Sequence, residues 1–261
     1  MVGKDKYQVG HDPAGYDDKE YLKKLFDSSK SSNIAFNELK FKFYVHEAHR
    51  NATLLQIEPF YKSLIEIDQK NPSFHETFAF FQTAMMDNSD KAEELYLDVL
   101  RYYPNSVSFI SNVGKFYLVN GEEAKAREYF DKALEIEPNY AKIFYYFAMI
   151  EKIKQNKEDS KKWFEKALET DPNLVVAHMN YANLLQTKFS DFDGAKKHYL
   201  EAIRSDPNHA NARGAFGELL FDEKNFDEAK VQFEEFLRGH PNHPAGNYIR
   251  ERLAAANEKL R

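Results

Sequence analysis

Six prolines recur at nearly constant spacing through most of this chain of 261 residues. They are separated by 32, 34, 34, 35 and 34 residues, and they are Pro72, Pro104, Pro138, Pro172, Pro207 and Pro241. Proline cannot continue an α-helix, because it lacks a backbone N–H donor and its ring clashes with the preceding turn. A period of this length therefore predicts a row of similar helical units, each in contact with its neighbours, rather than a single globular core.

Aromatic and small side chains precede the prolines at fixed distances. The residues eight before each proline are Leu64, Tyr96, Phe130, Phe164, Tyr199 and Phe233. Those five before are Ile67, Val99, Ala133, Ala167, Ala202 and Phe236, and those twelve before are Phe60, Ala92, Ala126, Ser160, Ala195 and Ala229. Because positions three and four apart share one helix face, each proline is predicted to end a helix whose aromatic residue packs inward.

A second helix is predicted after each proline. From Pro104 onward, a large residue nine positions later is followed by a small one, in the pairs Val113 and Gly114, Phe147 and Ala148, Tyr181 and Ala182, and Phe216 and Gly217. A small residue lets two helix backbones approach closely while the large neighbour fills the adjacent gap. The sequence therefore predicts an all-α fold with two antiparallel helices per unit.

This alternation resembles the tetratricopeptide repeat. Residues 107–140 match best, with Val113, Gly114, Tyr117, Gly121, Ala126, Phe130, Ala133 and Pro138 in register. Residues 141–174 depart at Glu151 and Ser160, and residues 175–209 carry one extra residue around 189–193. The resemblance implies a right-handed superhelical solenoid whose first helices line a concave side, where ligands commonly bind.

The pattern divides the chain into four regions. Residues 1–16 are predicted to be a mobile segment, 17–72 to form N-terminal helices and a degenerate repeat, and 73–243 to form the repeat array. Residues 244–261 are predicted to form a capping helix, because the last repeat of a solenoid exposes an apolar seam. The side chains expected to face the array are Tyr248, Ile249, Leu253, Ala256 and Leu260.

Composition argues against several classes of partner and location. The formal net charge of −6 disfavours a nucleic-acid ligand, since phosphate binding needs clustered Lys and Arg. The chain has no cysteine, so thiol catalysis, disulfides and thiolate metal sites are excluded. No apolar run is long enough for a signal peptide or for membrane insertion, so we expect a cytoplasmic protein.

No arrangement of residues indicates catalysis, a metal or a cofactor. His46-Glu47-Ala48-His49 is one residue too short for a zinc-protease helix. His240 and His243 flank a predicted turn and have no third ligand nearby in the sequence. We therefore predict a protein that is not an enzyme, with no catalytic residue, no metal site and no cofactor.

The predicted concave positions lie four, seven, eight and eleven residues after each proline. In the middle repeats they include aromatic and thioether side chains, which are enriched at binding hot spots, and amides, which both donate to and accept from a peptide backbone. The candidate partner-binding residues are Asn112, Tyr145, Tyr146, Met149, Met179, Asn180, Asn183 and Asn211. This set predicts an adaptor that holds a peptide or helix of a partner protein in the concave groove.

Two other interpretations fit the same residues. The tyrosines and methionines could instead fill gaps between neighbouring helices, which leaves the protein as a structural subunit bound through its outer helices and ends. The spacing of Phe144, Phe147 and Glu151 also resembles the half-a-TPR repeats of RNA-processing scaffolds, so an assembly of that kind is included in this alternative.

Overall fold

The structure is a computed structural model that describes residues 61–62, 65–66, 68–85, 88–241 and 243–261. The predicted mobile segment 1–16 and most of the predicted region 17–72 lie outside the described residues. The chain divides between Asn120 and Gly121 into two compact units, which we describe separately. This division falls between the two helices of repeat 107–140.

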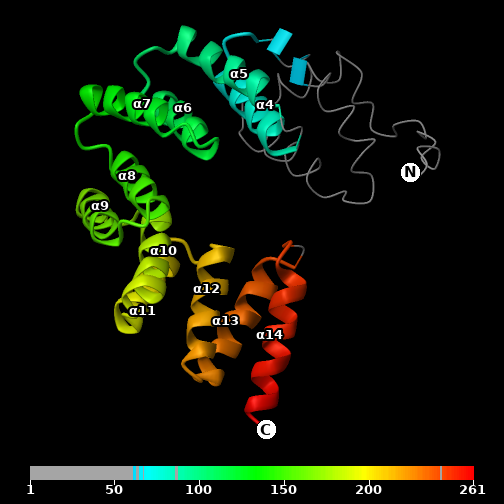
Figure 1. Cartoon of the computed structure of the whole chain (residues 1–261). Helices are drawn as coiled ribbons and strands as arrows, with labels where there is room; N and C mark the ends of the chain where they lie inside the picture. The colour runs from blue at the N-terminus through cyan, green and yellow to red at the C-terminus, as the bar shows by residue number, and fades with distance from the viewer. Residues whose placement is uncertain (1–60, 63–64, 67, 86–87, 242) are drawn as a thin grey trace, which may run out of the picture. The chain divides into compact units, whose positions relative to one another are not determined.

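Every regular element of the described residues is helical, which confirms the predicted all-α fold (Figure 1). The first unit contains α4 (Pro72–Met85), α5 (Ser89–Tyr102) and α6 (Val107–Val119). The second contains α7 (Glu123–Ile136), α8 (Ala141–Ile153), α9 (Lys157–Thr170), α10 (Val175–Leu184), the π-helical turn η2 (Leu185–Phe189), α11 (Phe192–Ser205), α12 (Ala210–Asp222), α13 (Phe226–Gly239) and α14 (Gly246–Lys259).

The prolines lie beyond helix ends, as predicted, and five of the six stand at the same distance from the helix. Helices α5, α7, α9, α11 and α13 each end two residues before the following proline. Pro72 lies beyond the helical residues 65–66 and the non-helical residues 68–71, and it is also the first residue of α4. The first turn of a helix tolerates proline well, since its missing N–H has no intrahelical partner there.

The turns inside the repeats of the second unit share one backbone conformation. A residue with positive φ stands at each of them, namely Gly121, Gln155, Ser190 and Lys224. After the last three, the next residue caps the following helix: Asn156, Asp191 and Asn225 each accept a hydrogen bond from the backbone N–H three residues on. The left-handed residue and the cap together end one helix and begin the next within three or four residues.

The predicted aromatic face forms the core of the second unit. Phe130, Phe164, Tyr199 and Phe233 are all buried, as are the small residues five and twelve positions before the prolines. Gly217 of α12 lies directly against Phe233 of α13, so closely that a Cβ atom built on it would stand 2.5 Å from Cε1 of that ring. The pairing of large and small residues is therefore confirmed.

The two departures from the repeat pattern in residues 141–174 have polar partners. Ser160 is buried, and its hydroxyl donates to the Ala148 carbonyl oxygen at 2.9 Å. The Glu151 carboxylate accepts from Arg127 Nη2 at 2.8 Å, and so joins α8 to α7. Each polar group is satisfied where the repeat pattern has an apolar one, so the helices keep their spacing.

The extra residue of repeat 175–209 lies in η2, slightly earlier than the predicted 189–193. A π-helical turn accommodates one additional residue within a continuous helix. The turn is held from α9, since Lys157 Nζ donates to the Lys188 carbonyl at 3.3 Å and lies 4.7 Å from the centre of the Phe189 ring.

Helix α14 packs against α13 (Figure 1). Ile249 is buried, and Arg252 donates to both carboxylate oxygens of Glu218 at 2.9 and 2.8 Å. Tyr248 and Leu260, which were predicted to face the array, are 51% and 41% exposed, although the Tyr248 side chain interacts with Glu218 of α12. The Arg252 guanidinium lies over the ring of Phe221, 3.8 Å from its centre. The capping role of residues 244–261 stays a prediction.

The close approach at Gly217 makes a testable prediction. Gly217→Ala inserts a methyl group against the fully buried Phe233 ring, so it should lower the free energy of unfolding by about 1 to 3 kcal/mol. Gly214→Ala is the matched control on the same helix, because its Cβ would meet Phe236 at an ordinary 3.5 Å. The control should gain up to about 1 kcal/mol of helix propensity. Urea unfolding measures both, and equal changes in the two variants would contradict the packing described.

Candidate functional site

Two neighbouring tyrosines of α8 occupy predicted concave positions. The ring centres of Tyr145 and Tyr146 are 5.2 Å apart, and both side chains are half-buried. Tyr146 stacks on Phe130 of α7 with a separation of 5.0 Å, and Tyr145 lies 6.2 Å from Phe164 of α9. Burial raises the pKa of the Tyr145 hydroxyl. Each ring is therefore positioned by the core while part of its surface stays accessible.

Asparagines of α10 lie beside these tyrosines. Asn180 Nδ2 donates to the Val176 carbonyl at 2.9 Å and lies 3.5 Å from the Tyr145 hydroxyl. Asn183 is one turn further along α10 and accepts at Oδ1 from Lys152 Nζ of α8 at 2.9 Å.

Met149 and Met179 are half-buried at the remaining predicted positions of these two helices. We give the name α8–α10 face to the six predicted residues of these two helices: Tyr145, Tyr146, Met149, Met179, Asn180 and Asn183.

The two other predicted residues are placed differently. Asn211 is exposed in the first turn of α12, and its side chain forms no hydrogen bond within the described part of the chain. Asn112 belongs to the first unit, where its Nδ2 donates to Glu76 Oε1 at 2.7 Å. The structure thus brings Tyr145 and Tyr146 of α8 together with Asn180 of α10, and within the described residues it does not join Asn211 to them by any hydrogen bond.

Lys152 is a residue of this face that the sequence interpretation missed. Lys152 lies fourteen positions after Pro138, which is one helical turn beyond the last predicted concave position, eleven after the proline. Extending the same spacing by one turn would have identified it. Burial, and to a smaller degree the nearby Lys188, lowers the pKa of its ammonium group. No carboxylate among the described residues forms an ion pair with it; its hydrogen-bond partner is the Asn183 amide oxygen.

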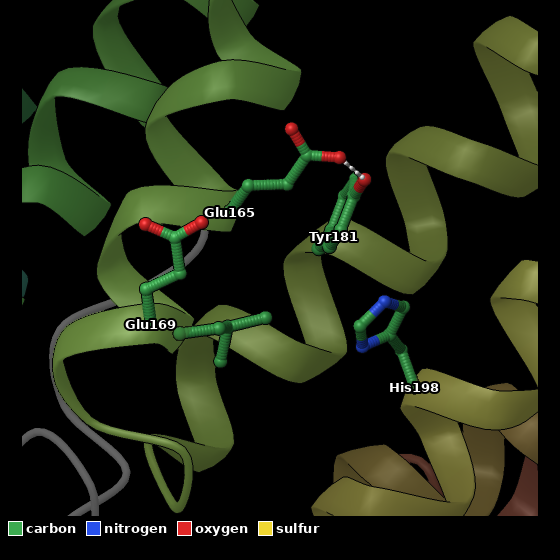
Figure 2. A pocket seen from close by; sticks show the side chains of 5 residues that line it. Glu165, Glu169, Tyr181 and His198 are labelled. Carbon is green, nitrogen blue, oxygen red and sulfur yellow. Dashed lines mark hydrogen bonds between the residues drawn. The ribbon is translucent and has the colours of Figure 1, made fainter.

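A separate open hollow lies where α9, α10 and α11 meet (Figure 2). Its lining consists of Glu165, Leu168 and Glu169 of α9, Tyr181 of α10 and His198 of α11. The Tyr181 hydroxyl donates to Glu165 Oε1 at 2.8 Å, which fixes that carboxylate in place. Burial, reinforced by this hydrogen bond, raises the pKa of Tyr181.

His198 forms the wall of the hollow on the α11 side, and it is paired with His178 of α10 behind it. His178 is buried, with Nε2 2.9 Å from the Pro172 carbonyl oxygen and Nδ1 2.9 Å from His198 Nδ1. A carbonyl only accepts, so Nε2 of His178 carries a proton. With both rings uncharged, His178 Nδ1 is then the acceptor and His198 Nδ1 the donor. Nε2 of His198 is left as a hydrogen-bond acceptor for a ligand.

The predicted turn at His240 and His243 holds an aromatic cluster. The two imidazoles lie 5.9 and 5.1 Å from the centre of the Phe236 ring. Within the described residues, no group of three His, Cys, Asp or Glu side chains is placed to hold a metal ion. Of the helices that the structure describes, none combines the length and the apolar character needed to cross a membrane.

Comparison with known families agrees with this architecture. Three families, each described as a tetratricopeptide repeat, match residues 86–141, 141–174 and 186–253, which together make up more than half of the chain. The chain therefore belongs to the tetratricopeptide repeat proteins. Repeats of this kind are protein-interaction modules.

Solved structures show the same fold. Yeast Tom70 is similar with a TM-score of 0.70 and 16% identity, over 94% of this chain and 56% of that chain. PilF of Pseudomonas aeruginosa is similar with a TM-score of 0.53 and 14% identity, over 72% of this chain and 90% of that chain. No curated protein matches the sequence.

The histidine pair predicts a dependence of stability on pH. Burial, and then the proximity of His178, lowers the pKa of His198 from 6.5 to about 4, so the folded protein binds this proton less readily than the unfolded chain. The contribution of this group to stability is therefore complete above pH 6.5 and is lost as the pH falls toward 4.

The variant His198→Gln removes this titration. We expect its melting temperature to fall less than that of the original protein between pH 7 and pH 5, as measured by circular dichroism. Parallel pH profiles for the two proteins would contradict the assignment.

Proposed function

We propose that this protein is a non-enzymatic cytoplasmic adaptor that holds a peptide or helix of a partner protein on the α8–α10 face. Asn211 of α12 is proposed to extend the contact, and Asn112 stays a candidate contact of the first unit. The observation that carries the proposal is the half-buried pair Tyr145 and Tyr146, which the core holds in place beside the Asn180 amide.

Prepositioned aromatic rings favour binding because little side-chain freedom is lost when a partner covers them. The stacking of Tyr146 on Phe130 and the contact of Tyr145 with Phe164 supply that restraint. Tyrosine is also enriched among the residues that dominate binding energy. A ligand that covers the accessible parts of both rings therefore gains apolar burial at a small cost in entropy.

Asn180 supports recognition of a peptide backbone. Its Nδ2 is held by the Val176 carbonyl, and no described residue donates to its Oδ1. The oxygen can accept from a partner backbone N–H group. Lys152 adds a half-buried cation without a paired carboxylate, so we propose that the bound segment carries an acidic side chain near Asn183.

A specific observation favours the second candidate function, a structural subunit of a larger assembly. Ile136, Leu200 and Val231 of the second helices are 46%, 46% and 50% exposed. Exposed aliphatic side chains on those helices suit contacts through the outer surface rather than through the α8–α10 face.

Two substitutions separate the candidates. Peptides selected from a random display library on the full-length protein provide the ligand, and fluorescence anisotropy measures affinity. Met149→Lys places a charge on the α8–α10 face and should weaken peptide binding by roughly tenfold or more. Asn180→Ala should weaken it about fivefold, the effect of one hydrogen bond, with little change in melting temperature.

Val231→Lys is the matched control, because it introduces the same charge at an exposed position of α13. It should leave the affinity unchanged. Loss of binding in Val231→Lys together with unchanged binding in Met149→Lys would overturn the proposal and favour the structural subunit.

A further inference from the structure

We infer that the hollow between α9, α10 and α11 is a second interaction site, which takes an arginine side chain of a partner protein (Figure 2). It is independent of the proposed function, because none of its lining residues belongs to the α8–α10 face.

Three acceptors from two helices converge on this hollow. Glu165 and Glu169 reach it from α9, and His198 reaches it from α11 (Figure 2). Tyr181 orients Glu165 by its hydrogen bond, and His178 orients His198 by holding Nδ1. His198 therefore offers Nε2 as an acceptor rather than a donor. Two of the three acceptors, Glu165 and His198, are thus prepositioned by buried neighbours.

The negative charges of Glu165 and Glu169 on α9 are poorly compensated by cations among the described residues. Glu165 and Glu169 are four residues apart, so their carboxylates repel each other. Glu169 forms no ion pair in the described part of the chain, and the only cation paired with Glu165 there is Lys161, whose Nζ is 4.0 Å from Oε1.

The other lysines of α9 are directed elsewhere. Lys166 Nζ lies over the Phe144 ring at 4.3 Å, and Lys162 pairs with Asp159 at 3.0 Å. An external cation would therefore relieve the repulsion between Glu165 and Glu169.

The shape of the acceptor set favours arginine over lysine. A guanidinium carries five N–H donors in a planar fork, which can reach two carboxylates and an imidazole nitrogen together. An ammonium group is a compact point charge with three donors. Leu168 supplies apolar surface between the two glutamates, against which the methylene stem of an arginine can pack.

The test uses small probes and the full-length protein at pH 7. N-acetyl-arginine methylamide is titrated while NMR follows the ring resonances of His198, assigned with His198→Gln. The uncharged isostere N-acetyl-citrulline methylamide and the lysine analogue serve as comparison probes. We expect saturable shifts with the arginine probe, weaker binding with lysine and no saturation with citrulline.

A pair of variants tests the role of charge. Glu169→Gln should weaken binding of the arginine probe about threefold, the size expected for a partly exposed ion pair. Glu135→Gln removes the same charge from an exposed position of α7 and should change nothing. The inference is overturned if the three probes bind alike, if the arginine probe causes no saturable shift, or if the two variants behave identically. None of these outcomes depends on peptide binding at the α8–α10 face.

Discussion

The fit of one buried aromatic ring against a small residue of the neighbouring helix determines the rest of this structure. Phe233 lies against Gly217 too closely to admit a Cβ atom, and Phe130, Phe164 and Tyr199 are buried at the equivalent positions of the other repeats. This contact sets the distance between the helices of a pair. Because a buried aromatic recurs once per repeat, the second unit stacks helix pairs without needing a central core.

Because the core uses only some positions of each helix, other positions are available for binding. Phe147 and Tyr181 of the first helices pack in the core together with the second-helix aromatics, whereas Tyr145 and Asn180 are only partly covered. The seam between successive repeats leaves a different surface, where Glu169 and His198 face one hollow. Two chemically distinct surfaces of the second unit, one aromatic and amide-rich and the other anionic, thus arise from the same repeated packing.

Features that repeat could be predicted from the sequence, whereas features that occur once could not. The buried aromatics and the helix ends follow from residue type at a fixed phase, and they were predicted correctly. The contact between His178 and His198 joins residues twenty positions apart that follow no repeat, and the pairing depends on ring orientation. The contact of Arg252 with Glu218 and the exposure of Tyr248 likewise occur once, and an apolar pattern does not reveal them.

The central claim is that partner segments bind to the α8–α10 face. Photo-crosslinking measures this most directly, with p-benzoylphenylalanine in place of Met149 in one sample and of Val231 in another, each mixed with a library-selected peptide. Mass spectrometry of the products reports which position contacts the peptide. The account predicts crosslinks from position 149 and none from position 231. Crosslinks from position 231 alone would contradict it.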